Sequence, residues 1–146
     1  MNSNWQAFLS SAGARISAAG VESFGDSNAE AAAAVRGTVL CDLTHYGLIR
    51  FSGEDSRQYL QSQLSCDVES IRTGTAQYGS YCTPQGRMLA SFLLWQDEAG
   101  YWMPLPRSLL EPIRKRLAKF ILRSKVKADD VSDDHVLMGL AGADAT

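Results

Sequence analysis

The residues of this sequence that could carry chemistry are few and scattered. Three cysteines, Cys41, Cys66 and Cys82, are widely spaced, form no Cys-x-x-Cys pair and have only His45 and His135 to help them bind a metal. Metal sites in proteins need closely spaced sets of such ligands. We therefore expect no metal site and three buried, reduced thiols, with Cys82 partly exposed because it lies just before a predicted turn.

Catalytic motifs do not stand out either. The sequence holds no Gly-x-Gly-x-x-Gly, Walker A, Gly-x-Ser-x-Gly or His-Glu-x-x-His motif. His45 lies beside Tyr46 at a strand edge, where a histidine is more often a hydrogen-bonded structural residue than an acid or a base. Glu54 and Asp55 precede a predicted helix, whose N-terminus favours negative charge, so helix capping explains them better than a catalytic carboxylate pair.

Aromatic residues on predicted strands are more suggestive, because rings on one sheet face can stack on a flat heteroaromatic ligand. Neighbouring residues alternate between the two faces, so the rings cannot all share one pocket. Without further information, an ordinary sheet core is the simpler interpretation. The residues are Tyr46, Tyr78, Tyr81, Trp95, Tyr101 and Trp102.

Charge is unevenly distributed. Lys and Arg (14) against Asp and Glu (16) give a net charge of −2, yet residues 107–127 hold eight of the basic residues and one acid, Glu111. This basic stretch could be a solvated face, a phosphate-contacting surface for RNA, or an attraction site for a polyanion such as a polyglutamylated cofactor. The solvated face is the simplest, because the one available aromatic, Phe120, falls on the buried side of the predicted helix.

The elements that must position these residues follow from hydrophobic spacing. Apolar residues three and four apart predict a helix over 5–12, and a capping box of Ser27 and Glu30 opens a second helix that Gly37 stops. A third helix follows Glu54 and Asp55, and a fourth carries the apolar stripe of 109–121, with Ser108 and Glu111 as its capping box. Strands are expected over 39–43, 46–51, 76–82, 88–95, 101–105, 124–128 and 136–140.

The turns between these elements also have sequence signatures. Thr83-Pro84-Gln85-Gly86 matches a type I turn, so 76–105 should form a three-stranded antiparallel meander. Four aspartates are expected to form an acidic, solvated turn: Asp129, Asp130, Asp133 and Asp134. Gly142-Ala143-Asp144-Ala145 repeats the arrangement of Gly53-Glu54-Asp55-Ser56, each after its own strand. From this repeat we expect the chain to be the front part of a longer protein.

Length and composition fit one globular domain that needs no disulfide bonds. Of the 146 residues, 45% are hydrophobic and 21% are charged. No apolar run approaches the roughly 18 residues of a membrane span, and the N-terminus lacks the basic start and apolar stretch of a secretory signal. We therefore expect a cytoplasmic protein with no membrane partner.

Four segments together resemble the YgfZ folate-binding proteins, which are relatives of the glycine-cleavage T-protein (GcvT, aminomethyltransferase). They follow one another in unbroken order: CDLTHYGLIRFSGEDSRQYLQSQLSCDV (41–68), GTAQYGSYCTPQGRMLASFLLW (74–95), FILRSKVKADD (120–130) and VLMGLAGADA (136–145). The resemblance implies an α+β fold, an antiparallel or mixed sheet with packed helices that forms the N-terminal portion of the GcvT-like folate-binding fold. It also implies three regions: a helical segment (1–37), a first folate-binding subdomain (38–135) and the start of a truncated βα subdomain (136–146).

The resemblance further implies tetrahydrofolate, or a folate derivative, as the cofactor. Tyr46 falls where the family places a side chain against the pterin, Tyr78 matches a tyrosine that the T-protein uses near folate, and Ser91 is the third expected binding position. Ala90 and Ser91 stand where the T-protein carries an Asp-Asp pair, one member of which is its catalytic acid. The loss of this acid argues against aminomethyl transfer and favours a non-enzymatic role.

The role that the resemblance implies is an accessory protein that supports iron–sulfur cluster assembly or repair and thereby tRNA modification. Its expected partners are folate, iron–sulfur enzymes, a weakly bound tRNA and the remainder of its own chain after Thr146, where the family's signature cysteine segment would lie. Two alternatives stay open. One is a folate-dependent aminomethyltransferase-like enzyme; the other is an RNA-contacting module using Arg114, Lys115, Lys119 and Arg123.

Overall fold

The computed structural model describes residues 2–142 and 145 and divides the chain into two compact units. One unit consists of Met1–Tyr46 and Ser132–Thr146, and the other is Gly47–Val131. The boundaries expected from the sequence lie after residues 37 and 135, whereas the structure divides the chain after 46 and 131. The difference arises because the last strand pairs with the first segment of the chain.

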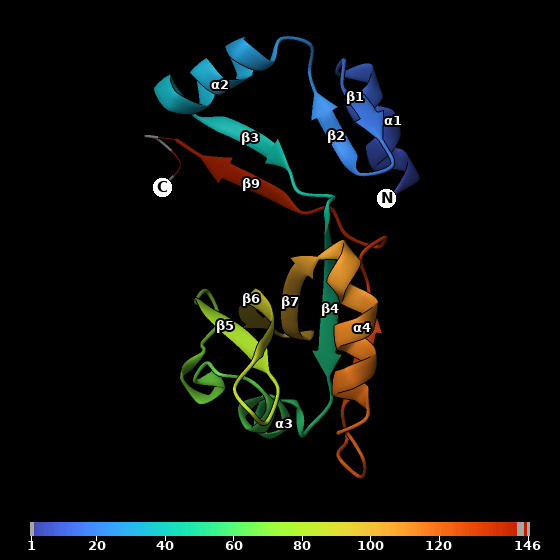
Figure 1. The fold of residues 1–146 in the computed structure, drawn as a ribbon, viewed down its shortest axis with the longest axis vertical. Coiled ribbons are helices and arrows are strands. Elements are labelled where there is room, and N and C mark those ends of the chain that lie inside the picture. Colours follow the sequence, from blue (N-terminus) through green and yellow to red (C-terminus); the bar gives the residue numbers. More distant parts are fainter. Residues whose placement is uncertain (1, 143–144, 146) are drawn as a thin grey trace. The chain divides into compact units, whose positions relative to one another are not determined.

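The first unit combines two helices with two small sheets (Figure 1). Its elements are α1 (Ser3–Ser11), β1 (Arg15–Ser17), β2 (Gly20–Ser23), α2 (Ser27–Arg36), β3 (Val39–Asp42) and β9 (Met138–Ala141). The strands pair antiparallel, β1 with β2 and β3 with β9. The predicted helices are therefore present, and the predicted strand over 136–140 forms as β9 on the edge of β3.

The second unit is built on one five-stranded sheet whose strand order is β5-β6-β7-β4-β8 (Figure 1). Its elements are β4 (Tyr46–Ser52), α3 (Ser56–Gln63), the 3-10 turn η1 (Val68–Ser70), β5 (Ala76–Cys82), β6 (Met88–Asp97), β7 (Gly100–Pro106), α4 (Arg107–Ala118) and β8 (Lys127–Asp130). β5, β6 and β7 form the predicted antiparallel meander. The fold class expected from the sequence, α+β, is confirmed.

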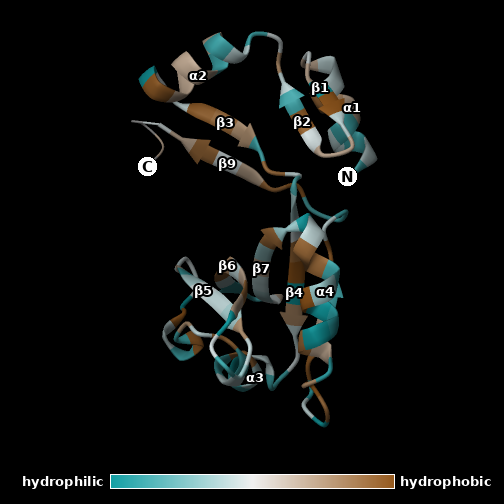
Figure 2. Ribbon diagram, in the orientation of Figure 1, coloured by the Kyte–Doolittle hydropathy of each residue, from teal (hydrophilic) through white to brown (hydrophobic). Residues whose placement is uncertain are grey.

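The core of the second unit lies between one face of this sheet and the helices α3 and α4. Ile49 and Phe51 of β4 are fully buried, as are Leu60 of α3 and Leu117 of α4. The hydrophobic colouring of β4 and of one side of α4 reflects this packing (Figure 2). Because each large apolar side chain contributes about 1.5–3 kcal/mol when buried, this cluster holds the sheet against its helices.

The two glycines of the repeated turn share a positive φ and a close approach to a backbone carbonyl. Gly53 follows β4 with φ 118°, and Gly142 follows β9 with φ 132°. A Cβ on Gly53 would collide with the carbonyl of Lys125, and one on Gly142 with the carbonyl of Gly37. The amide of Ser56 donates to Gly53 (3.1 Å), and the amide of Ala145 donates to Gly142 (3.2 Å). Ala143 and Asp144, which the sequence repeat includes, lie outside the described residues.

The helix caps differ from those expected. Asp26, not Ser27, caps α2, and its Oδ1 accepts from the amides of Asn28 (2.9 Å) and Ala29 (3.1 Å). Glu30 does not accept from the amide of Ser27, as a capping box would require. It accepts from the amide of Phe24, which precedes the helix (2.9 Å). The error arises because Asp26 and Ser27 are both good N-cap residues and the sequence does not choose between them.

The caps of α3 and α4 differ as well. Asp55 makes no side-chain cap on α3; its Oδ2 accepts from the amide of Lys125 (2.7 Å), while Glu54 pairs with the Lys125 ammonium (2.7 Å). α4 starts directly after Pro106 without a side-chain cap, and its expected capping residue Glu111 pairs with basic residues one turn later. Glu54 and Asp55, which follow β4, therefore bind Lys125 in the segment before β8. A local sequence pattern does not predict this contact, because the residues are far apart in the chain.

Two further expectations are wrong. Asp129 and Asp130 lie on β8 opposite β4, not in an acidic turn, because the strand begins at Lys127, later than predicted. Phe120 is 50% exposed, because α4 ends at Ala118 and the helical stripe does not reach residue 120. In the described part of the chain, no helix is long and apolar enough to cross a membrane.

Candidate functional site

The sheet of the second unit has a second face, opposite the core, that carries polar and aromatic side chains. In β6, Ala90, Phe92 and Leu94 belong to the core cluster, so alternation sends Ser91, Leu93 and Trp95 to the opposite side. We call this side the outer face. It comprises Tyr78 and Ser80 of β5, Ser91, Leu93 and Trp95 of β6, Trp102 of β7, Arg50 of β4 and Asp129 of β8.

One row of the outer face is held by charge and ring contacts. Trp95 and Trp102 are cross-strand partners. The guanidinium carbon of Arg50 lies 5.9 Å from the centre of the Trp102 ring, and Arg50 pairs with Asp129 at 3.7 Å. Cation–ring and cross-strand pairs of this kind fix side-chain orientation. This row was not predicted from the sequence. The position of Arg50 between the apolar Ile49 and Phe51 does indicate that its side chain lies on the other side of the sheet from theirs.

Tyr78 and Ser91, two of the expected binding residues, lie together on the outer face. Tyr78 pairs with Leu93, which is two residues from Ser91 on the same side of β6. Diagonal neighbours in such a pair are about 7–8 Å apart. Tyr78 is 85% exposed, which is unusual for a large aromatic residue on a sheet face. This ring is thus available to a ligand.

Two serines, Ser80 and Ser91, lie on the same side of the sheet as this ring. Ser91 pairs across the strands with Ser80, whose amide donates to Ser65 Oγ (2.8 Å) and whose hydroxyl lies 2.9 Å from Ser65 Oγ. Ser91 is exposed, and its hydroxyl makes no hydrogen bond within residues 2–142 and 145. The face therefore offers a flat ring with a hydrogen-bonding group beside it.

The two positions at which the sequence lacks the expected aspartates lie on opposite faces. Ala90 is 4% exposed and packs in the core opposite Tyr81, whereas Ser91 is on the outer face. A carboxylate at position 90 would be buried without water, and only one at position 91 could meet a ligand on the outer face. Ser91 is thus the position that decides whether an acid is present there.

Tyr46 belongs to the first unit, of which it ends the N-terminal segment. Its side chain is half-buried, and its ring lies 4.7 Å from the exposed ring of His45 at an interplanar angle of 57°. Tyr46, Tyr78 and Ser91 do not line either of the two cavities found in the second unit. The role of Tyr46 in folate binding stays a prediction.

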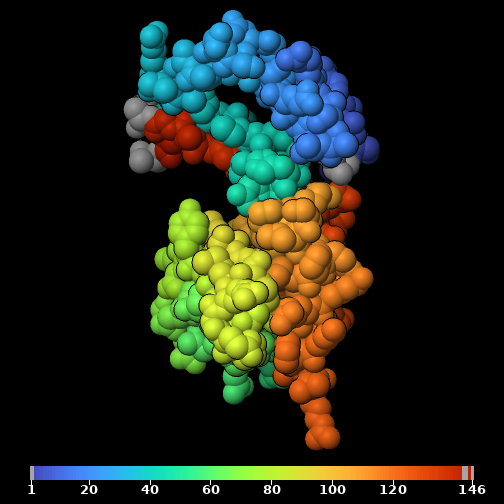
Figure 3. Space-filling view, in the orientation of Figure 1, coloured from blue at the N-terminus to red at the C-terminus, as the bar shows by residue number. Residues whose placement is uncertain are grey.

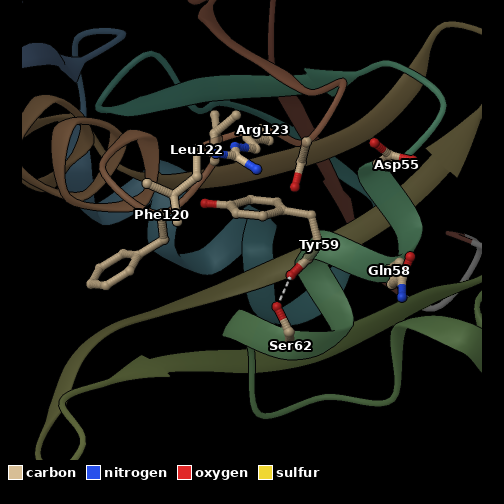
Figure 4. Close-up of a pocket in the computed structure, with 9 residues that line it drawn as sticks. Asp55, Gln58, Tyr59, Ser62, Phe120, Leu122 and Arg123 are labelled. Atoms are coloured by element: carbon tan, nitrogen blue, oxygen red, sulfur yellow. Dashed lines mark hydrogen bonds between the residues drawn. The ribbon is translucent and has the colours of Figure 1, made fainter.

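Two cavities open elsewhere in the second unit. The larger, about 860 Å³, lies between α3 and the segment after α4; its walls are Asp55, Gln58, Tyr59, Ser62, Phe120, Ile121, Leu122, Arg123 and Ser124 (Figure 4). The smaller, about 360 Å³, is lined by Ser62, Gln63, Leu64, Ser65, Ser80, Tyr81, Cys82, Thr83, Pro84, Arg116 and Phe120. Sequence reasoning missed both, because residues far apart in the chain form their walls.

Tyr59, which lines the larger cavity, and Glu111 of α4 are both engaged by the fold. Burial, and to a smaller extent Tyr81, raises the pKa of Tyr59 above its ordinary value, and its hydroxyl donates to the carbonyl of Leu117 (2.6 Å). Hydrogen bonds from Arg114 and then Lys115 hold the pKa of Glu111 below its usual range. Neither group is placed to act as an acid or base at neutral pH.

The cysteines are all free, as expected, but not all buried. Cys41 is exposed on the two-stranded β3–β9 sheet, and Cys66 and Cys82 are half-buried. Burial, and next Asp67, raises the pKa of the Cys66 thiol, although a backbone hydrogen bond opposes the shift. Among the described residues, no group of three or more His, Cys, Asp and Glu could hold a metal ion.

Comparison with known proteins agrees with this architecture. A family model described as the GCVT N-terminal domain matches residues 8–146. The chain belongs to the GCVT N-terminal domain family. The fold of this chain is similar to that of the glycine cleavage system aminomethyltransferase T from Bartonella henselae, with a TM-score of 0.81 and 18% sequence identity. The match covers 99% of this chain and 41% of the aminomethyltransferase chain. At this identity, the likeness concerns the fold alone.

Relatives in sequence carry another name. The tRNA-modifying protein YgfZ of Photobacterium profundum is 36% identical over 106 residues, 73% of this GCVT-family chain and 32% of the relative. The protein of the same name from Vibrio vulnificus strain CMCP6 is 32% identical over 103 residues, 70% of the chain and 31% of the relative. The chain thus spans about a third of the length of these relatives. The expected resemblance to the YgfZ and T-protein group is confirmed.

Proposed function

We propose that this chain binds tetrahydrofolate, or a folate derivative, on the outer face of the second unit. The observation that carries the proposal is the 85% exposed ring of Tyr78 beside the free hydroxyl of Ser91. A flat, reduced pterin would cover the exposed ring, and its polar edge would meet the serine. Tyr46, the first residue of β4 and part of the first unit, is proposed as a folate contact from the sequence resemblance alone.

The residues of the outer face fit such a ligand in their chemistry. The face offers a ring, hydroxyls at positions 80 and 91, and an apolar neighbour in Leu93. Folate supplies one-carbon chemistry when it is bound to enzymes, yet position 91, beside the exposed ring, is a serine and not a carboxylate that could move a proton, and the carboxylate of Asp129 on this face is paired with Arg50. The chain's own residues would therefore bind and orient the ligand without reacting with it.

This absence favours an accessory role over an aminomethyltransferase-like enzyme. The relatives named tRNA-modifying protein YgfZ support a role connected with tRNA modification. We propose that the role is exerted through support of iron–sulfur cluster assembly or repair in the enzymes that modify tRNA, and that the protein works in the cytoplasm. Iron–sulfur enzymes would then be its partners.

Isothermal titration calorimetry with tetrahydrofolate tests the binding step. We expect a measurable affinity for the wild-type protein and about a tenfold loss for Tyr78→Ala, because one stacking contact is worth roughly 0.5–1.5 kcal/mol beyond its buried area. Tyr46→Ala should also weaken binding. Phe24→Ala, which removes an exposed ring of the first unit, serves as the control and should leave affinity unchanged. An absence of binding heat, or equal affinities for all variants, would refute the proposal.

A further inference from the structure

The two cavities of the second unit adjoin one another, since both include Ser62 and Phe120 in their walls. We call the combined depression the Phe120 groove. The segment between α4 and β8 projects from the surface of the second unit (Figure 3). In this segment Phe120 is 50% exposed and Leu122 is 87% exposed, and Leu122 has a positive φ of 47°.

Phe120 is available for stacking. Its ring points away from the ring of Tyr59, which also lines the larger cavity (Figure 4). Tyr59 itself is 5% exposed and donates its hydroxyl hydrogen to Leu117, so it is part of the fold rather than a free contact. An aromatic side chain that is half exposed between two cavities offers a face to any planar group that enters either of them.

The basic residues around the groove divide into paired and unpaired groups. Arg114 and Lys115 both pair with Glu111 (2.9 and 3.2 Å), and Lys125 pairs with Glu54. In contrast, the side chains of three other basic residues make no ion pair or hydrogen bond within the described part of the chain: Arg116, Lys119 and Arg123. Arg123 lines the larger cavity, and Arg116 lines the smaller one.

The described residues that line the groove hold one negative charge, and a backbone amide binds it. Asp55 is the one carboxylate among the described residues that line either cavity, and its Oδ2 accepts from the amide of Lys125 at 2.7 Å. The other polar groups of the walls are amides and hydroxyls, such as Gln58 and Gln63. The groove therefore presents two unpaired guanidinium groups, those of Arg116 and Arg123, against the one carboxylate of Asp55, with neutral hydrogen-bonding groups and one ring, which suits an anionic ligand with flat groups.

We propose that the Phe120 groove binds single-stranded RNA. A base stacks on Phe120, and the phosphates on its two sides are held by Arg116 and Arg123. Single-stranded nucleic acid repeats a planar base and a negative charge, and this repeat matches one ring with an unpaired guanidinium in each adjoining cavity. An acidic polypeptide would satisfy the cations but would leave the ring without a planar partner. The proposal does not depend on folate binding.

Fluorescence anisotropy with a short fluorescein-labelled oligouridylate tests this inference on the whole protein. At low salt we expect binding that weakens linearly in log affinity with log salt. Arg116→Ala and Arg123→Ala should each reduce the magnitude of this slope by about 0.7, the contribution of one phosphate contact on a single strand. Arg36→Ala removes an exposed arginine of α2 and should leave the slope unchanged.

The ring has its own pair of variants. Phe120→Leu keeps an apolar side chain without a ring and should weaken binding about tenfold, whereas Phe120→Tyr should keep most of the affinity. The proposal is overturned if the wild-type protein does not bind the oligonucleotide at low salt, or if the arginine variants match Arg36→Ala. It is also overturned if Phe120→Leu lowers the melting temperature without changing RNA affinity, since Phe120 would then pack within the fold and not contact a base.

Discussion

At the scale of single residues, alternation along β6 decides which positions can meet a ligand. Ala90 and Ser91 are neighbours in sequence, yet one lies in the core and the other on the outer face. Of the two positions that the family resemblance singles out, only residue 91 can therefore present an acid to a ligand on the outer face. This distinction could not be made from the motif alone, because a motif does not state which of its residues faces inward.

Aspartate substitutions at these two positions test their placement. Ser91→Asp should change the free energy of unfolding by less than about 0.5 kcal/mol, because the carboxylate stays in water. Ala90→Asp should lower it by about 3 kcal/mol, because a charge is buried without a partner. Urea unfolding of the two variants measures the difference. Equal losses would show that β6 does not present these residues to opposite sides.

Thiol alkylation tests the environments of the cysteines. Cys41 is exposed, whereas Cys66 is half-buried and burial raises its pKa, so Cys66 holds less of the reactive thiolate at neutral pH. We expect iodoacetamide to label Cys41 first and Cys66 much more slowly, as followed by peptide mass spectrometry. In denaturant the rates should become similar. Fast labelling of Cys66 in the native protein would contradict the burial described here.

At the scale of elements, the glycine after β4 fixes how the strand leaves the sheet. Gly53→Ala places a Cβ against the carbonyl of Lys125 at φ 118°, so we expect a loss of about 3 kcal/mol in unfolding free energy. Gly86 also has a positive φ but has open space around it, and Gly86→Ala should cost only about 1 kcal/mol. Chemical denaturation of both variants gives the comparison, and a smaller loss for Gly53→Ala than for Gly86→Ala would contradict it.

The surface of α4 has a pH-dependent contact. The pKa of Glu111 is lowered by Arg114 and Lys115, so its ionised form stabilises the folded state above the usual glutamate pKa of about 4.3, and this contribution is lost as the pH falls through the lowered value. Glu111→Gln should therefore lower the melting temperature at neutral pH but not in strong acid. Glu98→Gln, at an exposed acid outside any ion pair of the described chain, is the control. If Glu111→Gln also lowers the melting temperature in strong acid, the ion pairs of Glu111 are not the cause of the loss.

Local patterns predicted the elements better than their ends. The meander was predictable because Pro84 and Gly86 define a tight turn between two apolar strands, and the turn forms with the amide of Gly86 donating to Thr83 (2.9 Å). The contacts of Asp55 with Lys125 and of Arg50 with Asp129 were not predictable, because each joins segments that are distant in sequence. The Phe120 groove was not predictable either, because its walls also come from segments that are distant in sequence.

The candidate site divides in the same way. Tyr78 and Ser91 were found through a resemblance, and strand alternation then explains why they share a face. The exposure of Phe120 was missed because it depends on where α4 ends, and residues 119–121 continue the helical spacing although the helix stops at Ala118. Spacing predicts a face of a helix but not its last residue.

At the scale of the whole molecule, the second unit carries the outer face and the Phe120 groove, whereas the proposed folate contact Tyr46 belongs to the first unit. The outer face lies on the side of the sheet away from the core, and the Phe120 groove lies among α3, β5 and the segment after α4. The chain spans about a third of the length of its YgfZ-named relatives. The two surfaces share Ser80, which also lines the smaller cavity, but variants of Tyr78 and of Phe120 test them separately.

A crystal structure of the protein with tetrahydrofolate tests the central claim most directly. The account predicts that the pterin lies flat against the ring of Tyr78, with its polar edge at the hydroxyl of Ser91, on the outer face. A pterin bound instead in the Phe120 groove, or a Tyr78 ring left uncovered in a crystal that contains the ligand, would contradict it.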